Sequence, residues 1–155
     1  MKIKVRDLHK IFGKNPEKAI PLIEKGMEKD EILEKTGATV GVNNASFDVA
    51  EGEIFVIMGL SGSGKSTLLR CINRLIEPTA GEIEVDGTDL MSLNHDQLRE
   101  FRREKFGMVF QNFALFPYRT VIENAEFGLE IQGVSKEKRR EKANKALQQV
   151  GLDGW

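Results

Sequence analysis

The chain has 155 residues, and 23 Lys and Arg stand against 24 Asp and Glu, which gives a formal net charge of -1. With 40% hydrophobic and 30% charged residues, the composition is typical of one soluble globular domain. A single cysteine excludes a disulfide framework, and the balanced charge argues against a nucleic-acid binder held by bulk electrostatics. The longest apolar run, residues 54–60, is far shorter than the ~20 residues of a membrane-spanning helix. We therefore expect a cytoplasmic protein with neither a membrane span nor a signal peptide.

Two N-terminal segments alternate apolar and polar residues. Residues 2–8 and 45–49 both show this period of two, which predicts half-buried strands of an antiparallel edge sheet. The Lys- and Glu-rich residues 14–39 between them predict one or two short surface helices.

Proline and glycine predict where these short helices begin and end. Asn15 and Pro16 supply an N-cap and a first-turn proline. Pro21 is expected to break the first helix, and Gly37 to close the second.

A strand, a glycine loop and a helix are predicted next. Residues 54–58 are apolar at every position, as in a strand buried on both faces of a parallel sheet. The loop of residues 59–64 follows, and then a helix with one apolar face that Pro78 stops. Residues 82–86 predict a further strand that ends in an Asp86-Gly87 turn.

The remaining residues predict three helices and one strand. Asn94 is expected to cap the first helix, and the apolar residues 106–110 to form a short strand. Thr120 and Glu123 form a capping box for a helix that runs to about residue 131. Ser135 is expected to cap a charged helix through residue 150, whose mixed charges indicate a solvated face.

The glycine loop matches the phosphate-binding pattern G-x-x-x-x-G-K-[ST] at every fixed position. Its glycines allow successive N–H groups to turn toward phosphate oxygens, and the following helix adds the partial positive charge of its N-terminus. Lys65 is expected to reach the β and γ phosphates, and the Ser66 hydroxyl to bind Mg²⁺. The alternative is a glycine-rich turn that only joins a strand to a helix. The predicted binding residues are Gly59, Leu60, Ser61, Gly62, Ser63, Gly64, Lys65, Ser66 and Thr67.

A second stretch resembles a known family. Residues 108–124 read Met-Val-Phe-Gln-Asn-Phe-Ala-Leu-Phe-Pro-Tyr-Arg-Thr-Val-Ile-Glu-Asn, which is similar to the Q-loop region of ABC transporter ATP-binding subunits. Residues 41–49 and 78–83 also match the edge sheet and the turn after the first helix in that family. The insertion between residues 12 and 39, together with residues 56–61 and 73–78, looks most like the glycine betaine and proline importers.

The resemblance implies an α/β fold, namely the P-loop NTPase core of an ABC-type ATPase. An antiparallel β edge and part of a helical subdomain would complete this C-terminally truncated core. We expect residues 1–155 to form one partial ATPase domain, with a helical insertion at 14–39. Residues 53–76 would carry the phosphate-loop unit, and residues 106–155 the Q-loop and the start of the helical subdomain.

The resemblance also implies roles for single residues around ATP and Mg²⁺. Lys65 and Gln111 would be catalytic, and Ser66 and Gln111 would lie at the metal. A neutral amide can orient water, contact a metal and then withdraw, which suits Gln111. Phe12 matches the aromatic residue that stacks on adenine. The alternatives are a polar strand end for Gln111 and a core residue of an edge strand for Phe12.

Partners are likewise implied by the resemblance alone. A subunit of this kind lies peripherally on the cytoplasmic face of the membrane, paired with a second copy and with a membrane permease. An external solute-binding protein takes part indirectly, and no nucleic acid is expected. Residues 113–118 would face the permease, and the alternative is an ordinary hydrophobic loop packed on the domain.

Three functional elements of the family are absent from the sequence. It has no apolar run ending in Asp-Glu, no Leu-Ser-Gly-Gly signature and no counterpart of the switch histidine. We therefore expect a truncated or fragmentary subunit that binds ATP with little turnover and has an unpaired sheet edge. Two other functions remain open: a non-catalytic nucleotide-binding or interaction module, and a soluble ABC ATPase acting on nucleic acid.

One cysteine and two histidines are further candidates for reactive or metal-binding groups. Cys71 lies between apolar neighbours and is predicted to be a small buried residue. His9 and His95 each stand alone, without a second ligand nearby in the sequence, and neither is predicted to bind a metal.

Overall fold

The computed structural model describes residues 2–111 and 114–152. It divides into two compact units, Met1–Asn94 and His95–Trp155, which are described separately.

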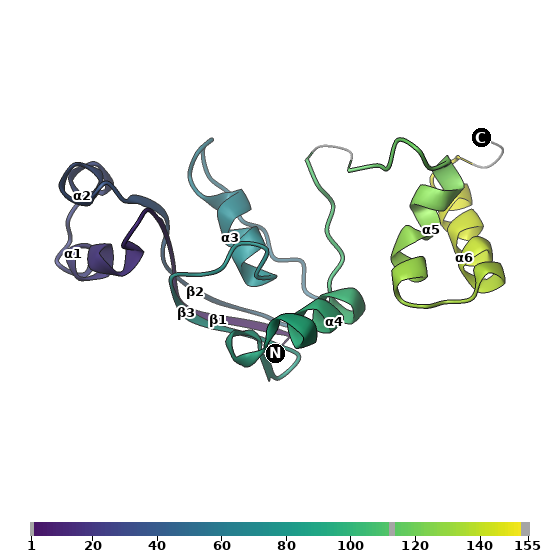
Figure 1. Cartoon of the computed structure of the whole chain (residues 1–155), viewed down its shortest axis with the longest axis horizontal. Helices are drawn as coiled ribbons and strands as arrows, with labels where there is room; N and C mark the ends of the chain where they lie inside the picture. The colour runs from purple at the N-terminus through teal and green to yellow at the C-terminus, as the bar shows by residue number, and fades with distance from the viewer. Residues whose placement is uncertain (1, 112–113, 153–155) are drawn as a thin grey trace. The chain divides into compact units, whose positions relative to one another are not determined.

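A four-stranded antiparallel sheet is the framework of the first unit (Figure 1). Its order is β2-β1-β3-β4, and β1 pairs with both β2 and β3. The antiparallel edge sheet predicted from the alternating residues is therefore confirmed. The strands are β1 (Ile3–Phe12), β2 (Thr39–Val49), β3 (Ala80–Val85) and β4 (Thr88–Asp89).

The register between β1 and β2 changes near the end of β1. Lys10 pairs with Val42, whereas the next residue, Ile11, pairs with Val40. The register thus skips Gly41, which is the extra residue of a β-bulge. A bulge bends its strand, increases the local twist and changes the direction of nearby side chains.

A tight turn joins β3 to β4. Val85 pairs with Thr88, so the connection contains only Asp86 and Gly87, with φ angles of 51° and 75°. Positive φ at both central residues is what a type I′ hairpin turn requires. The predicted turn is confirmed.

Helix α3 (Lys65–Ile72) covers the sheet and contacts β1 and β2. Its buried residues Cys71 and Ile72 join Val5, Leu8 and Ile83 of the strands in the core of this unit. Burying these apolar side chains away from water stabilises the unit.

The predicted continuation of this helix toward Pro78 is wrong, because α3 ends at Ile72. Arg74 has a φ of 53°, outside the helical region, and the Asn73 side chain accepts a hydrogen bond from the Leu75 N–H at 3.1 Å. A side-chain acceptor of this kind competes with the helical pattern and ends the helix.

The insertion between β1 and β2 forms three short helical segments with a small core of their own. They are η1 (Pro16–Ala19), α1 (Ile20–Glu24) and α2 (Lys29–Thr36). Figure 1 shows α1 and α2 beyond one end of the sheet. Their core joins the two strands to the helices through Ile11, Ala19, Ile32, Ala38 and Val40.

The sequence signals in this insertion have mixed outcomes. Gly37 ends α2 in the left-handed conformation, as predicted. Pro21 was expected to break a helix, but it lies in the first turn of α1, where its missing N–H costs nothing. Asn15 does occupy the N-cap position before Pro16, although its side chain makes no capping hydrogen bond.

Two predicted strands are not formed. Residues 54–58 and 106–110 are in neither helix nor strand, and Ile54 and Val109 are 90% and 99% exposed. A central strand needs backbone partners, and no described residue of its own unit pairs with either segment. The parallel sheet that residues 54–58 were predicted to join is therefore not formed within the described residues of either unit.

The second unit contains the helices α4 (His95–Lys105), α5 (Val121–Ile131) and α6 (Lys136–Gln149). Helices α5 and α6 lie side by side (Figure 1). The capping box of Thr120 and Glu123 is confirmed by reciprocal hydrogen bonds. Ser135 occupies the predicted N-cap of α6, but its hydroxyl makes no capping bond.

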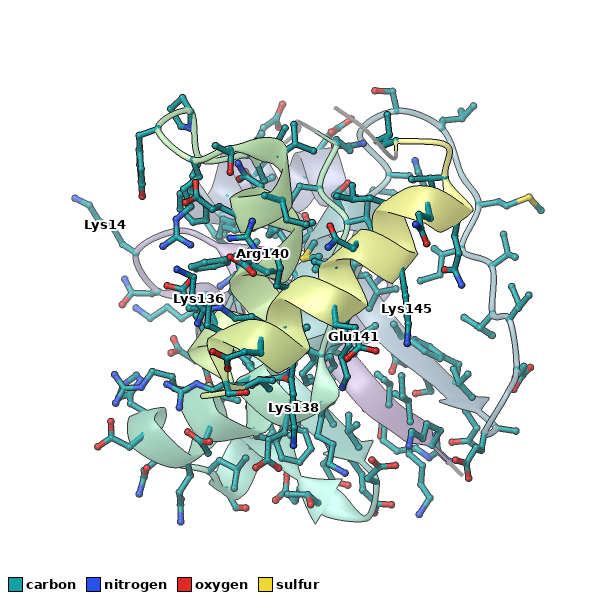
Figure 2. All side chains as sticks on the ribbon, turned by 90° about the vertical axis from the view of Figure 1, so that its right-hand side faces the viewer. Lys14, Lys136, Lys138, Arg140, Glu141 and Lys145 are labelled. Carbon is teal, nitrogen blue, oxygen red and sulfur yellow. The ribbon has the colours of Figure 1, made fainter. Side chains whose placement is uncertain are left out.

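The charged face of α6 is exposed, as predicted. Figure 2 shows Lys136, Lys138 and Lys145 on this helix, and Glu141 accepts a hydrogen bond from Lys145 at 2.7 Å. This exposed face therefore carries charges of both signs and is not purely basic.

Candidate nucleotide-binding site

The phosphate loop leads directly into α3. Its two positive φ angles are at Gly62 and Gly64, at 79° and 92°, and Gly64 is the N-cap of the helix. The Ser63 N–H donates to the Leu60 carbonyl at 3.2 Å, which closes a turn inside the loop. These conformations strongly favour glycine and place the backbone at the N-terminus of α3, where anions are favoured.

Gly64 also makes a close approach to β2. A Cβ atom added at Gly64 would lie 2.1 Å from the carbonyl oxygen of Gly41, well inside van der Waals contact. The loop is therefore packed against β2 at a point where a larger residue does not fit. This contact joins two glycines that lie 23 positions apart in the chain.

The Lys65 ammonium group lies at the loop itself. It donates hydrogen bonds to the carbonyl oxygens of Gly59 and Leu60 at 2.8 and 2.7 Å, and it lies 3.4 Å from the Ser63 Oγ. A positive charge is thus brought to the glycine turn, as an anion site requires. Ser66 follows in the first turn of α3 and is exposed, and Thr67 is half-buried.

A hollow of about 260 Å³ lies between the loop and β2. Gly41 and Val42 line it on the strand side, and Gly59, Ser63 and Lys65 line it on the loop side. Whole-ligand pockets usually measure roughly 300–1,000 Å³, so this hollow suits part of a nucleotide. Glycine backbone, an ammonium group and hydroxyls are the donors that a phosphate chain with Mg²⁺ needs, and the residues present therefore fit ATP-Mg.

Phe12 lies close to this loop through Gly41. A Cβ atom at Gly41 would be 2.7 Å from the Cε2 atom of Phe12, so the ring rests on the glycine. The ring is 41% exposed, and the Lys10 ammonium lies 4.9 Å from its centroid. Gly41 alone thus separates Phe12, the predicted base-stacking residue, from Gly64 of the phosphate loop.

Gln111 belongs to the second unit and is exposed. Its predicted place beside the metal stays a prediction. Asn112 and Phe113, the next two residues of the predicted Q-loop region, lie outside the described residues.

The loop from Leu115 to Tyr118 packs on the domain in part, and its contact with a permease stays a prediction. Phe116 packs edge to face on Phe127 of α5, with ring centroids 4.6 Å apart. Leu115 and Tyr118 remain exposed, Tyr118 by 77%. One aromatic residue therefore anchors the loop, and its neighbours are left available to a partner.

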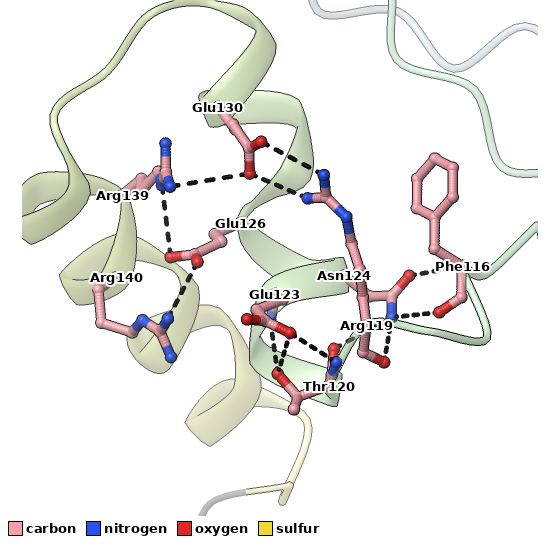
Figure 3. A network of polar contacts seen from close by, with 9 residues as sticks. All are labelled: Phe116, Arg119, Thr120, Glu123, Asn124, Glu126, Glu130, Arg139 and Arg140. Carbon is pink, nitrogen blue, oxygen red and sulfur yellow. Dashed lines mark hydrogen bonds and ion pairs between the residues drawn. The ribbon is translucent and has the colours of Figure 1, made fainter.

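A polar network holds this loop on α5 and α6 (Figure 3). Asn124 accepts from the Phe116 N–H at 2.8 Å and donates to the Phe116 and Arg119 carbonyl oxygens. Arg119 binds Glu130 at 2.9 Å, and this hydrogen bond lowers the pKa of Glu130 below its ordinary value. Sequence reasoning missed Asn124, although its position one turn after the capping Thr120 was a usable signal.

A buried carboxylate joins the same two helices. Glu126 of α5 is 2% exposed and lies 3.1 Å from Arg140 and 3.7 Å from Arg139 of α6 (Figure 3). A buried charge is tolerated only when it is paired, so these two arginines make the burial possible.

Cys71 and His9 are both buried. Cys71 is buried, as predicted, and its burial raises the pKa of the thiol to about 11. His9 is also buried, and its Nδ1 atom accepts from the Asn44 N–H at 3.4 Å. Over residues 2–111 and 114–152, no group of three or more His, Cys, Asp and Glu residues could hold a metal ion.

Residues 42–155 match the protein family described as ABC transporter. The chain belongs to this family. The solved structures agree: an ATP-binding cassette determined as a dimer in a post-hydrolysis state, bound to ADP and Pi, superposes with a TM-score of 0.77 at 33% identity. The match covers 98% of this chain and 58% of that chain. The α/β fold of an ABC-type P-loop ATPase core is therefore confirmed.

Curated relatives of this ABC family chain include glycine betaine transport proteins. The glycine betaine transport ATP-binding protein OpuAA of Bacillus subtilis is 60% identical over 100% of this chain, which is 37% of its own length. The glycine betaine/carnitine transport ATP-binding protein GbuA of Listeria monocytogenes is 61% identical over 99% of this chain and 39% of its own. The chain thus spans less than two fifths of these relatives. In its described part, no helix combines the length and the apolar character needed to cross a membrane.

Proposed function

We propose that this chain is the nucleotide-binding part of an ATP-binding subunit that powers the import of glycine betaine and proline-type osmolytes. The observation that carries the proposal is the phosphate loop, with the Lys65 ammonium at its carbonyl oxygens and Gly64 at the N-terminus of α3. The similarity to glycine betaine transport proteins over the whole chain supports the solute class.

In this proposal the chain positions the phosphates, and bound Mg²⁺ neutralises their charge. Main-chain N–H groups of residues 59–67 bind the phosphate chain, Lys65 contacts the β and γ phosphates, and Ser66 supplies a hydroxyl for the metal. Phe12 stacks on the adenine base, and Gln111 orients the attacking water. Positioning and charge supply most of the catalysis of phosphoryl transfer.

The proposed subunit works at the cytoplasmic face of the membrane, with a permease, a second copy of itself and, indirectly, an external solute-binding protein. Leu115 and Tyr118 are exposed on the loop that Phe116 anchors, which makes them candidates for contact with the permease. Within the chain, we assign residues 14–39 to an insertion, 53–76 to the phosphate-loop unit and 106–155 to the Q-loop and the start of the helical subdomain.

Calorimetry with MgATP tests the site through a Lys65→Ala variant. Removing the ammonium group should weaken binding by about a hundredfold or more, because a charge-assisted contact to phosphate is lost. Lys25→Ala, which removes an exposed lysine of the insertion, should leave the affinity unchanged. Equal affinities of the Lys65→Ala variant and the unaltered chain would contradict the proposed site.

Turnover measured beside binding tests the alternative of a non-catalytic module, which turnover comparable with that of a complete subunit would exclude. We expect the 155-residue chain to bind ATP and to hydrolyse it orders of magnitude more slowly than a complete subunit, because the acidic strand end and the signature are absent. Uptake of glycine betaine by the complete transporter under osmotic stress should fail with Lys65→Ala. Uptake that persists in this variant would exclude the transport function, and salt-sensitive binding of DNA or RNA would favour the nucleic-acid alternative.

A further inference from the structure

Gly41 touches both predicted ends of the nucleotide site. It is the bulge residue that the register between β1 and β2 skips. On one side it supports the Phe12 ring, and on the other its carbonyl oxygen abuts Gly64 of the phosphate loop. It also lines the hollow beside the loop.

The space around Gly41 leaves no room for a side chain. An added Cβ atom would lie 2.7 Å from Cε2 and 3.4 Å from Cδ2 of Phe12, and 3.3 Å from the Lys10 carbonyl oxygen. Real Cβ atoms essentially never show the shortest of these distances, so the Phe12 ring would have to move. Gly41 needs no positive φ, and its residue type is therefore explained by this close approach alone.

A nucleotide places two demands on such a site at once. Its base and its phosphates are covalently joined, so stacking and phosphate binding add only when platform and loop have the separation that the ligand spans. Gly41 lies between the two and contacts both. The bulge at Gly41 therefore fixes the separation between the Phe12 ring and the phosphate loop.

We propose that Gly41 is a positioning residue of the nucleotide site, which sets the place of the Phe12 ring relative to the phosphate loop and thereby the contact with the base. This inference rests on the proposed function, because it takes ATP as the ligand. It adds a residue that the phosphate-binding pattern does not contain and that acts through Phe12.

Calorimetry of Gly41→Ala with two probes tests this role. MgATP carries the base, whereas Mg-tripolyphosphate presents only the phosphates. The displaced ring should weaken MgATP binding by about tenfold, the usual effect of losing one base-stacking contact, and leave tripolyphosphate affinity within about twofold. Gly128→Ala is the matched control, because it adds the same methyl group where no atom lies within 4 Å.

A double-mutant cycle with Phe12→Ala separates positioning from folding defects. When the ring is absent, Gly41→Ala has nothing to displace, so adding it to Phe12→Ala should leave the MgATP affinity unchanged. Circular dichroism of each variant and its retained tripolyphosphate binding report an intact loop.

Other outcomes overturn the proposal in distinct ways. Equal weakening of both probes would mean that Gly41 acts on the phosphate loop through Gly64. An unchanged MgATP affinity in Gly41→Ala, or a further loss in the Phe12→Ala background, would exclude positioning of the ring. If the unaltered chain binds neither probe, the proposed nucleotide function fails, and this inference fails with it.

Discussion

Two separate features require glycine at position 64: the local backbone conformation and a contact with a distant residue. Its φ of 92° is unfavourable for residues with a Cβ atom, and the Gly41 carbonyl oxygen fills the space that a Cβ would need. Gly62 shares the first requirement, with a φ of 79°, but no atom lies within 4 Å of its Cβ position. The two loop glycines therefore allow backbone strain to be separated from steric overlap.

Alanine at each glycine should give different losses of stability. Gly62→Ala incurs only the left-handed conformation, at about 1–2 kcal/mol. Gly64→Ala adds overlap with backbone atoms that cannot rotate away, so we expect more than about 3 kcal/mol. Urea unfolding followed by far-ultraviolet circular dichroism measures both. Similar losses in the two variants would show that the contact with Gly41 is unimportant.

At the scale of the element, the N-caps of α5 and α6 differ. The Thr120 hydroxyl accepts from the Glu123 N–H at 3.4 Å and donates to the Glu123 carboxylate at 2.9 Å. The hydrogen bonds from Thr120 lower the pKa of Glu123, the backbone N–H most of all. Ser135 occupies the same position before α6 without a capping bond.

This difference predicts unequal effects of two similar substitutions. Thr120→Ala removes both hydrogen bonds of its hydroxyl and should destabilise the second unit by about 1 kcal/mol. Ser135→Ala removes no capping bond and should change stability by less than about 0.3 kcal/mol. Thermal unfolding of the two variants decides the matter, and a larger effect at Ser135 would refute the assignment of the caps.

Elements with local signals could be predicted from the sequence, and elements that depend on partners could not. Thr120 with Glu123, Gly37 and the Asp86-Gly87 turn each act within a few residues, and all three are confirmed. Residues 54–58 have the composition of a central strand, but strand formation requires neighbours elsewhere in the chain. The outcome there is an exposed segment.

The candidate site likewise has one part that could be predicted from the sequence and one part that could not. The pattern from Gly59 to Ser66 predicted the loop and the start of the helix, because its chemistry is local. The role of Gly41 could not be predicted, because its contacts with Phe12 and Gly64 arise only when β1, β2 and the loop come together. A one-residue register shift leaves no mark in the alternation of β2 that could have indicated it.

At the scale of the whole molecule, apolar side chains remain open to water on one segment. Ile54, Val56, Met58 and Leu60 are all strongly exposed. Contiguous apolar surface of this kind usually marks an interface or a site of aggregation.

The isolated chain should therefore bind a hydrophobic dye and elute as species larger than a monomer. Ile54→Lys with Met58→Lys should reduce both signals, because charge interrupts the apolar surface. Leu33→Lys, at a partly exposed leucine of α2, is the control and should change neither. Dye fluorescence and size-exclusion chromatography test this, and a dye-free monomer would contradict it.

Cys71 lies in α3 six residues after Lys65, fully buried and with its pKa raised to about 11. At neutral pH this thiol is protonated and shielded, so maleimide reagents should pass it by. Because the chain has no other cysteine, a second one introduced on the surface would take up a fluorophore alone. Single-site labelling is thus possible without first replacing the native thiol.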